Sequence, residues 1–436
     1  MTESTDWFSR AQAVVPGGVH SPSRSWVAIG GGSPPYLARA AGAYLYDTAG
    51  RRYIDYIAAL GPVILGHGHP AVAAAVAAAA AGGTVYGCCH PDEVLVAEAL
   101  AAAVPGLEQV RFTASGTEAV MSAVRLARAA TGRDIVVKFG GSYHGHWDGA
   151  LTAAGSAAAT LGLTQSAGIP AGVAADVVTV PYNDLPALER ALATRRGQVA
   201  AVLVEPVAAN MGVVMPAAGF LAGLGRLTAE AGALVIADEV VTGFRGRYGT
   251  ISQELGLTPD IVCLGKVVGG GLPLGAYGGA RALMRWVSPA GPMYQDGTWA
   301  GNPVSLAAAR AALAELSRPD FYPPLAQRAQ HLAAGLAAAA AAAGVRVTIN
   351  RWAGMFTVFF TRGPVDGEAA ANRSSAQRFA QWARGLWASG VAVAPSRFEA
   401  LFITAAHTDA DVDQTLAAAA EALRAMGPDL GVDNDS

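Results

Sequence analysis

The sequence has few cysteines, and their spacing excludes the usual cysteine-based frameworks. Only three of its 436 residues are cysteine, namely Cys88, Cys89 and Cys263, and no Cys-x-x-Cys spacing occurs. Adjacent cysteines are not expected to bond each other, so neither a disulfide scaffold nor a cysteine zinc site is predicted. This usage is typical of a reduced protein, and we expect a cytoplasmic location.

Charge is also scarce. Charged residues make up 14% of the chain and the net charge is -3, which argues against nucleic acid as the main partner. The longest alanine-rich runs, at 71–81 and 337–343, are too short and too weakly apolar to span a bilayer, so no membrane partner is expected. No basic segment followed by an apolar one opens the sequence, so we expect no signal peptide.

Lysine is the rarest of the basic residues. Of the 30 lysines and arginines together, only Lys138 and Lys266 are lysines. A primary amine can form a Schiff base with a carbonyl group, which a guanidinium cannot, so a lysine in an arginine-rich chain is a candidate for amine chemistry. A surface lysine retained by chance is the alternative. Lys266 follows an apolar run at 260–264 and precedes a glycine-rich turn at 269–271.

The order of apolar and helical segments predicts an α/β protein. Strand-like runs lie at 43–57, around a turn, and then at 109–113, 134–139, 200–205, 233–238 and 260–264. Helical stretches are predicted between and after these strands, at 117–130, 185–194, 219–231 and 302–316. Alternation of this kind is typical of a mostly parallel sheet that helices cover on both faces.

Two further regions depart from this alternation. Residues 151–172 are rich in Ala, Gly, Ser and Thr and carry little periodicity, so we expect a mobile loop that could serve as a lid. A helix near 325–343, strands at 344–349 and 354–361, and a helix at 409–426 predict a smaller α+β lobe.

A helix start follows the strand at 109–113, where the chain reads Ser115-Gly116-Thr117-Glu118-Ala119. The free N–H groups of a helix N-terminus bind anions, Gly116 permits close approach, and Thr117 adds a hydroxyl. The segment therefore fits a phosphate cradle. Taken alone, an ordinary N-cap by Ser115 or Thr117 explains the same residues.

An aromatic residue on a glycine turn follows the strand at 134–139. The run begins Gly140-Gly141-Ser142 and continues with Tyr143, whose ring could lie flat on a planar cofactor, or simply pack against the sheet. His144 and His146 have the chemistry of metal ligands. No third ligand accompanies them, so no metal site is expected.

An acidic residue ends the strand at 233–238. A carboxylate there is costly unless it meets a cation, and the ring nitrogen of a pyridine cofactor would suit Asp238. Capping of the next turn and magnesium binding are the alternatives, but no Walker-type glycine-lysine run supports a nucleotide site. Asp238 and Lys266 are 28 residues apart, about one strand–connection–strand step. We therefore expect them on nearby strands, at the same sheet edge.

These four strand ends together match the groups of pyridoxal phosphate. They offer a phosphate cradle, a flat aromatic ring, an acid for a ring nitrogen and an amine for an aldehyde. The glycines at 269–271 do not form the GxGxxG pattern, which counts against a nicotinamide dehydrogenase. Each motif alone is weak evidence for a cofactor site. The prediction depends on all four motifs lying at the same edge of the sheet.

Over nearly its full length the chain resembles the class III aminotransferases, within the fold-type-I pyridoxal phosphate enzymes, and most of all their aminomutases. The segments that carry the resemblance are Pro16-Gly17-Gly18-Val19, Ile64-Leu65-Gly66-His67, Ser115-Gly116-Thr117-Glu118-Ala119, Tyr143-His144-Gly145-His146, Pro181-Tyr182-Asn183-Asp184-Leu185, Val204-Glu205-Pro206-Val207, Asn210-Met211-Gly212-Val213-Val214, Asp238-Glu239-Val240, Thr242-Gly243-Phe244-Arg245, Leu264-Gly265-Lys266, Gly301-Asn302-Pro303 and Phe398-Glu399-Ala400.

The resemblance implies a fold and an assembly. It implies the α/β fold of fold-type-I pyridoxal phosphate-dependent transferases, with a large cofactor-binding domain at 63–312 around a mostly parallel seven-stranded sheet. A smaller α+β domain would combine residues 1–62 with 313–436. The expected assembly is a homodimer in which Thr298 completes the phosphate site of the partner subunit.

The resemblance also implies roles for individual residues. Lys266 would form the Schiff base and move the proton, Asp238 would keep the pyridine nitrogen protonated, and Tyr143 and Val240 would enclose the ring. The implied cofactor-binding set is Ser115, Gly116, Thr117, Tyr143, His144, Glu205, Asn210, Asp238, Val240, Lys266 and Thr298. Substrate carboxylate, amine and carbonyl groups would meet Ser21, Arg24, Ser156 and Glu399.

The implied reaction is an intramolecular amino transfer that starts from the pyridoxamine phosphate form and yields 5-aminolevulinate, the tetrapyrrole precursor. Four sites depart from the family's usual pattern, all on the expected substrate side: His20 replaces Asn, Leu60 replaces Trp, and the stretches 85–93 and 298–303 differ. Neutral drift is one explanation. The other is a class III aminotransferase that moves a distal or β amine to a 2-oxo acid. A non-enzymatic or nucleotide-binding α/β protein is the third hypothesis.

Overall fold

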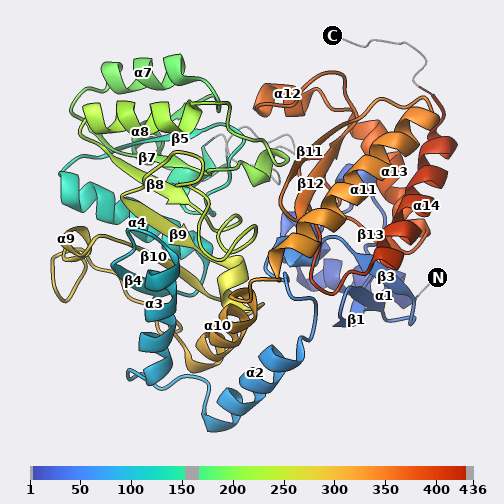
Figure 1. Cartoon of the computed structure of the whole chain (residues 1–436), viewed down its shortest axis with the longest axis horizontal. Coiled ribbons are helices and arrows are strands. Elements are labelled where there is room, and N and C mark those ends of the chain that lie inside the picture. The colour runs from blue at the N-terminus through green and yellow to red at the C-terminus, as the bar shows by residue number, and fades with distance from the viewer. Residues whose placement is uncertain (1–2, 153–165, 429–436) are drawn as a thin grey trace.

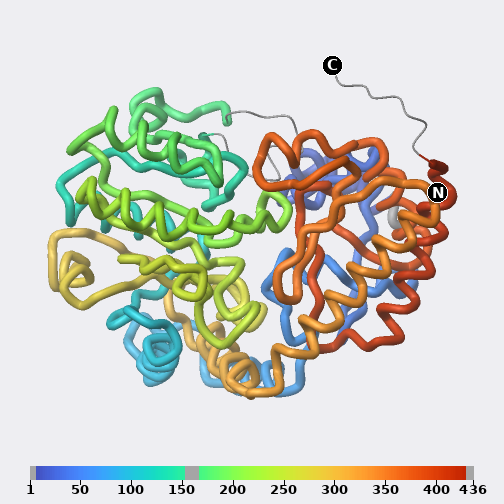
Figure 2. Tube along the Cα trace, turned by 45° about the horizontal axis from the view of Figure 1, so that its top comes forward, coloured from blue at the N-terminus to red at the C-terminus, as the bar shows by residue number. Residues whose placement is uncertain are grey.

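The computed structural model describes residues 3–152 and 166–428. Figure 1 shows two lobes, with helices α2 (Pro70–Gly82) and α10 (Pro303–Leu316) along the lower edge. Both ends of the described chain lie in the smaller lobe, as the blue and red segments of Figure 2 show. Within these residues, no helix is long and apolar enough to cross a membrane.

The larger lobe is built on a seven-stranded sheet. Its strand order is β4-β10-β9-β8-β7-β5-β6; β10 is antiparallel to both neighbours, and the other pairs are parallel. The strands are β4 (Gln109–Thr113), β5 (Ile135–Phe139), β6 (Val177–Val180), β7 (Val199–Val204), β8 (Leu234–Asp238), β9 (Ile261–Leu264) and β10 (Gly275–Gly279). The predicted mostly parallel seven-stranded sheet is therefore confirmed.

Helices cover both faces of this sheet, because its central strands are apolar on both sides. Helix α4 (Gly116–Thr131) packs on one face, where Val136, Ala201 and Ile236 form a core with it. Helices α7 (Leu185–Thr194) and α8 (Phe220–Glu230) pack on the other face. The other helices of this lobe are α3 (Pro91–Ala103), α6 (Ala171–Ala175) and α9 (Arg281–Met284).

The smaller lobe combines the two ends of the chain in two sheets. One sheet has the order β1-β2-β3-β13, and the other has the order β11-β12-β14. Their strands are β1 (Leu37–Ala41), β2 (Tyr44–Asp47), β3 (Arg52–Asp55), β11 (Thr348–Trp352), β12 (Met355–Phe359), β13 (Val391–Ala392) and β14 (Leu401–Phe402). The helices are α1 (Glu3–Val14), α11 (Tyr322–Ala342), α12 (Glu368–Asn372), α13 (Ala376–Ala388) and α14 (Asp409–Met426). The exact domain boundaries stay a prediction.

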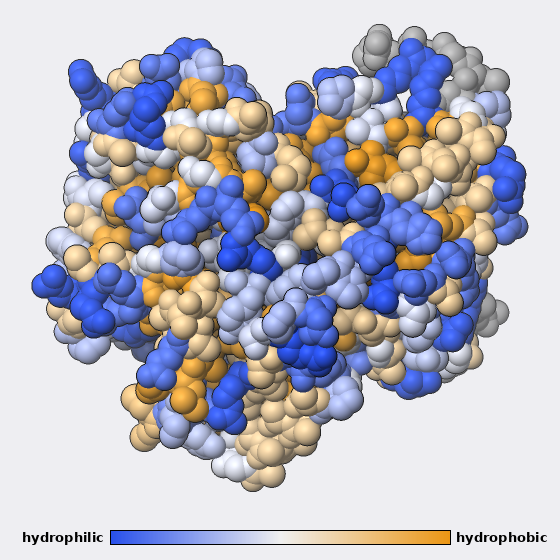
Figure 3. Space-filling model, in the orientation of Figure 1, coloured by the Kyte–Doolittle hydropathy of each residue, from blue (hydrophilic) through white to orange (hydrophobic). Residues whose placement is uncertain are grey.

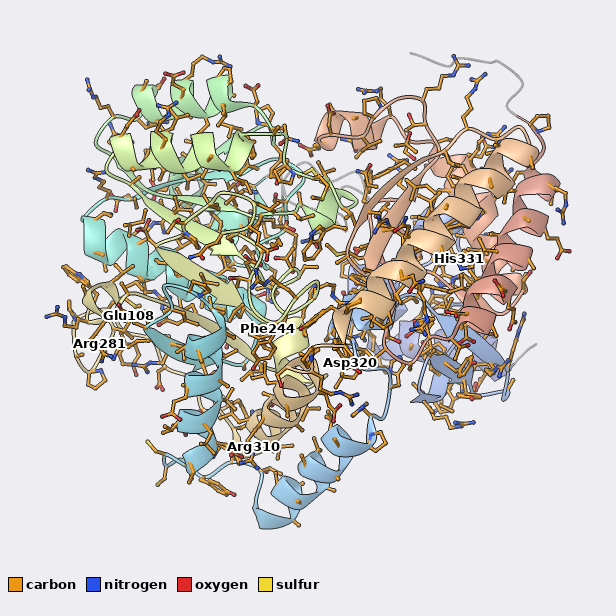
Figure 4. All side chains as sticks on the ribbon, viewed as in Figure 1. Glu108, Phe244, Arg281, Arg310, Asp320 and His331 are labelled. Carbon is orange, nitrogen blue, oxygen red and sulfur yellow. The ribbon has the colours of Figure 1, made fainter. Side chains whose placement is uncertain are left out.

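The two lobes contact each other closely. The hydroxyl of Tyr322, at the start of α11, donates to the carbonyl oxygen of Phe244 at 3.2 Å, and Figure 4 shows Phe244 where the two lobes meet. Figure 3 shows a notch between the lobes at the top of the same view. Phe244 follows β8, so the interface between the lobes lies beside the carboxyl ends of the parallel strands, where the site is predicted.

Most predicted elements are present, with three kinds of difference. The predicted strand at 344–349 is wrong in its first residues, because α11 ends in a turn at Gly344, and β11 begins only at Thr348. Strands β6 and β10 were not predicted. Three of the five residues of β10 are glycine, which disfavours strands. The proposed lid at 151–172 falls largely on residues 153–165, which lie outside the described residues.

Candidate active site

Lys266 lies just beyond the carboxyl end of the interior strand β9. It opens a short 3-10 turn, Lys266–Gly269, with a φ of 47°, a conformation that side chains other than glycine rarely adopt. The side chain faces a cavity and is otherwise enclosed by protein. Burial lowers the pKa of its amine, whereas the nearby carboxylates of Glu399, Glu205 and Asp238 raise that pKa. A half-buried lysine on a strained backbone is typical of a functional site.

Asp238 ends the neighbouring parallel strand β8, and its backbone pairs with Cys263 of β9. Its Oδ2 atom lies 2.7 Å from Nδ1 of His144, and its Oδ1 accepts a hydrogen bond from the backbone N–H of Val240 at 3.1 Å. The carboxylate is 5% exposed. The predicted placement of Asp238 and Lys266 on nearby strands, at one sheet edge, is confirmed.

Glu205 connects two parts of the site. It follows β7, is almost fully buried, and accepts a hydrogen bond from the backbone N–H of Tyr143 at 3.0 Å. Its second oxygen accepts from the amide of Asn210 and from the backbone N–H of Ala209, both at 3.0 Å. Burial raises the pKa of Glu205, and the nearby His144 lowers it. The side chain therefore holds the turn of Tyr143 and the segment of Asn210 together.

Helix α4 points its N-terminus at the same cavity. Ser115 is its N-cap: the hydroxyl accepts from the backbone N–H of Glu118 at 3.2 Å, and the Glu118 carboxylate accepts from the backbone N–H of Ala114 at 2.7 Å. Gly116 lies against Val240, since a Cβ on this glycine would come within 2.9 Å of a Val240 methyl group. The ordinary N-cap and the predicted anion cradle thus coexist at one helix start.

One cavity of about 180 Å³ joins these groups. Its lining residues are Ser115, Gly116, Thr117, Val120, Tyr143, His144, Gly145, Asn210, Asp238, Val240, Val241 and Lys266. Within the described residues, no group of three His, Cys, Asp or Glu side chains could hold a metal ion. The cavity therefore presents a helix N-terminus, an aromatic ring, a carboxylate and an amine to one small space.

The predicted substrate residues do not all gather at this cavity. Glu399 is close enough to affect the pKa values of Lys266 and Tyr143. Arg24 lines a separate cavity of about 640 Å³, together with His20 and Leu60. Ser21 lies beside it in sequence, with its hydroxyl 2.8 Å from that of Ser23.

Two other predicted residues are placed differently. Ser156 lies outside the described residues, so its role stays a prediction. Thr298 is exposed and does not line the cavity of its own chain, and its role at a partner's site stays a prediction.

Sequence reasoning missed several residues around the site. Val120, Gly145 and Val241 line the cavity. Gly145 lies within the segment 143–146 that carries the resemblance, and Val120 and Val241 directly follow the segments 115–119 and 238–240. Arg245 is 1% exposed, donates to the carbonyl of Gly61 and lies within electrostatic reach of Lys266. It ends the segment Thr242-Gly243-Phe244-Arg245, which carries part of the family resemblance, but no role was predicted for it.

Comparison with known proteins agrees with this geometry. Residues 31–419 match the family described as aminotransferase class III. A glutamate-1-semialdehyde 2,1-aminomutase from Symbiobacterium thermophilum is 52% identical over 419 residues, covering 96% of this chain and 97% of that protein. The enzyme of the same name from Roseiflexus castenholzii is 50% identical over 423 residues, covering 97% of each.

Solved structures of a transaminase and an aminomutase also resemble this chain over nearly its full length. An omega-transaminase from Sphaerobacter thermophilus superposes with a TM-score of 0.90 at 32% identity, covering 97% of both chains. A glutamate-1-semialdehyde aminomutase from Pseudomonas aeruginosa PAO1 has a TM-score of 0.85 at 30% identity, covering 96% of this chain and 94% of that one. With a family match over most of its length and relatives at half identity, this chain belongs to the class III aminotransferases.

Proposed function

We propose that this protein is a pyridoxal phosphate-dependent glutamate-1-semialdehyde 2,1-aminomutase, which forms 5-aminolevulinate for tetrapyrrole biosynthesis. The observation that carries the proposal is the convergence of Lys266, Asp238 and the N-terminus of α4 on one cavity. Four relatives between 47% and 52% identical over nearly the whole chain bear that enzyme's name. A solved variant of the Pseudomonas aeruginosa enzyme contains PMP.

The residues present fit the cofactor. Gly116 leaves the approach to the α4 N-terminus open, because any side chain there would meet Val240. Asp238 supplies a carboxylate for a cationic ring nitrogen, and Nε2 of His144 is buried with no hydrogen-bond partner in the described part of the chain. When bound, pyridoxal phosphate supplies an electron-withdrawing ring and a carbonyl that exchanges amines.

The chain's own residues account for binding, orientation and proton movement. We assign phosphate binding to Ser115, Gly116 and Thr117, and ring orientation to Val240 and Tyr143. Burial lowers the pKa of the Lys266 amine, which increases the share of the neutral form that can accept a proton at Nζ. The carboxylate of Glu399 lies near this amine and is suited to orient the amino groups of a substrate.

We also propose a cytoplasmic homodimer. Several apolar side chains around α3 and the loop before α10 are exposed, namely Val85, Tyr86, Val94, Leu95, Tyr294 and Trp299, and contacts between subunits would bury such a surface. Thr298 lies in the same loop. The exposed thiols of Cys88 and Cys89 suit a reducing compartment. Light scattering at micromolar concentration tests the assembly; a monomer there would contradict it.

A transaminase that uses a 2-oxo acid is the second candidate. It is favoured by the omega-transaminase from Sphaerobacter thermophilus, which superposes with a TM-score of 0.90. Leu60 and His20, which depart from the aminomutase pattern, both line the larger cavity beside Arg24. A change of substrate would be expected at such positions.

Two experiments test these assignments. Borohydride reduction followed by peptide mass analysis should place a pyridoxyl group on Lys266; an adduct on Lys138, or none, would overturn the cofactor assignment. The pyridoxamine form is then supplied with glutamate-1-semialdehyde and no other amine donor. Multiple turnovers to 5-aminolevulinate support the aminomutase. Turnover only with a 2-oxo acid and a separate amine supports the transaminase.

A further inference from the structure

One arginine is enclosed where the two lobes meet. Arg245 follows β8 and is 1% exposed. Its Nη2 atom donates to the carbonyl oxygen of Gly61, and its guanidinium carbon lies 4.9 Å from the ring centre of Phe402 in β14. Its Nε and Nη1 atoms are buried without a hydrogen-bond partner among the described residues. Burying a cation in this way is costly, and groups of this kind are concentrated at functional sites.

The loop that carries Arg245 is anchored at the end of β8. Glu239, which is 0% exposed, accepts from the hydroxyl of Thr242 at 2.6 Å and from the backbone N–H of Ser252 at 2.8 Å. The backbone N–H of Arg245 donates to the carbonyl oxygen of Thr242 at 3.0 Å. The preceding residue, Phe244, has a φ of 57°, a conformation that persists only where the surroundings support it. Hydrogen bonds at both ends of the loop therefore hold Arg245 in position.

Gly61, which accepts the hydrogen bond from Arg245, lies directly against the side chain of Lys266. A Cβ atom built on Gly61 would come within 3.2 Å of the Cδ atom of Lys266 and within 3.6 Å of the ring of Phe402. Gly61 follows residues 58–60, each of which has a positive φ. The hydrogen bond from Arg245 therefore fixes the end of a strained turn that packs on the Lys266 side chain.

The amine of Lys266 lies among several titratable groups. They are Glu399, Glu205, Asp238, Arg245, Tyr143 and His144. Burial lowers the pKa of this amine, the three carboxylates raise that pKa, and Arg245 lowers it. Burial lowers the pKa of Arg245 itself to about 9, so the guanidinium stays charged at neutral pH. The positive charge of Arg245 therefore opposes the effect of the three carboxylates on Lys266.

We propose that Arg245 is a positioning residue for Lys266: it holds Gly61 against the lysine side chain and places a positive charge near the amine. Arg245 does not line the cavity of Lys266, so it acts through Gly61 and through its charge. A nearby positive charge favours the neutral amine, which is the form that accepts a proton at Nζ. In its readouts through the bound cofactor, the inference rests on the proposed function.

An absorbance titration of the cofactor-loaded enzyme tests the effect of the charge. It follows the protonation of the nitrogen that joins Lys266 to bound pyridoxal phosphate. Arg245→Met removes the charge and the donor, so the titration should move to higher pH. Arg245→Lys keeps a positive charge and a donor, and should return the titration towards that of the wild type. Arg247→Met removes an exposed arginine of the same loop, which pairs with the exposed Glu254, and should leave the titration unchanged.

Equilibrium dialysis of the cofactor tests the contact with Gly61. Folded Arg245→Met should bind pyridoxal phosphate roughly 10-fold more weakly, because a small displacement of a reacting group is costly. Gly61→Ala should weaken binding to a similar extent, since its Cβ would press on the Lys266 side chain. Gly50→Ala is the control for backbone strain: this glycine also has a positive φ, of 83°, but its Cβ would meet nothing within 4 Å.

Three outcomes would overturn the proposal. The first is a folded Arg245→Met protein with the titration and the cofactor affinity of the wild type. The second is a titration that moves as far in Arg245→Lys or Arg247→Met as in Arg245→Met. The third, which decides the matter if Arg245→Met does not fold, is equal cofactor binding by Gly61→Ala and Gly50→Ala.

These readouts need no substrate, which separates the proposal from the proposed reaction. A wild-type protein that binds the cofactor through Lys266 but makes no 5-aminolevulinate would overturn the proposed reaction and leave the role of Arg245 standing.

Discussion

Nδ1 of His144 lies 2.7 Å from Oδ2 of Asp238, and both side chains are buried. His144 lies in the turn after β5, and Asp238 is the last residue of β8. The two residues meet only because both strands end at one edge of the sheet. The contact fixes the orientation of the carboxylate. A buried carboxylate oriented in this way is a preorganised electrostatic group. It should stabilise a nearby positive charge more strongly than an exposed carboxylate would.

Asp238→Asn should lower kcat by about 10²- to 10³-fold, the range for losing one preorganised group, because the neutral amide no longer stabilises a cationic ring nitrogen. Steady-state kinetics with saturating cofactor provide the measurement. The matched control is Asp260→Asn, at the opposite end of the strands, where the carboxylate accepts from the backbone N–H of Val235 at 2.7 Å. That variant should lose stability and keep its kcat. Equal kcat in both variants would contradict the assignment.

Gly116→Ala should weaken retention of pyridoxal phosphate by about 10-fold, because its Cβ would come within 2.9 Å of Val240 and push the first turn of α4 out of place. Equilibrium dialysis of the cofactor measures the loss. Gly225→Ala, in the middle of α8 and 3.5 Å from a Leu257 methyl group, provides the control. It should leave binding unchanged and stabilise the helix slightly. A Gly116→Ala protein that binds pyridoxal phosphate as tightly as the wild type would contradict phosphate binding at the N-terminus of α4.

The turn before the large lobe contains residues in a strained conformation. Ala58, Ala59 and Leu60 all have a positive φ, from 44° to 64°, and each costs about 1–2 kcal/mol in a residue other than glycine. Ala59→Gly should therefore raise the free energy of unfolding by up to about 1 kcal/mol. Ala78→Gly, in the middle of helix α2, should lower it by about 1 kcal/mol. Urea denaturation measures the free energy of unfolding of both variants. A lower value for Ala59→Gly as well as for Ala78→Gly would show that glycine at position 59 does not release the strain.

His407 should make stability depend on pH in the acid range. Its Nδ1 accepts from the backbone N–H of Thr404 at 3.0 Å, and burial lowers its pKa from 6.5 to about 4. Between these values the unfolded chain binds a proton that the folded protein does not. Stability is therefore complete above pH 6.5 and falls as the pH drops towards 4, by on the order of 3 kcal/mol.

Denaturation at a series of pH values measures this slope. His407→Asn, which keeps an acceptor for Thr404, should flatten the slope between pH 6.5 and 4. His331→Asn, on the exposed face of α11 (Figure 4), should leave it unchanged. A slope that persists in the His407 variant would assign the pH dependence to another group.

Much of the large sheet was predictable because its strands are short apolar runs with clear ends. Strands β4, β5, β7, β8 and β9 lie within one residue of their predicted bounds, and α7 begins and ends at the predicted residues. Strand β10 could not be predicted in the same way. Its glycines owe their extended backbone to pairing with β4 and β9 rather than to their own propensity.

Lys266 and Asp238 show what the sequence determined by itself. Each follows an apolar strand in a parallel sheet, and parallel strands place their carboxyl ends at one edge, so local pattern was enough to bring the two residues together.

Only the tertiary structure decided the burial of Lys138 and the surroundings of Gly140. The carboxylate of Glu368, which lies against Gly140, comes from the other lobe and is 228 residues away in sequence (368 − 140). No local periodicity encodes a contact between lobes. A buried charge depends on whichever element packs against it, and packing is a property of the whole fold.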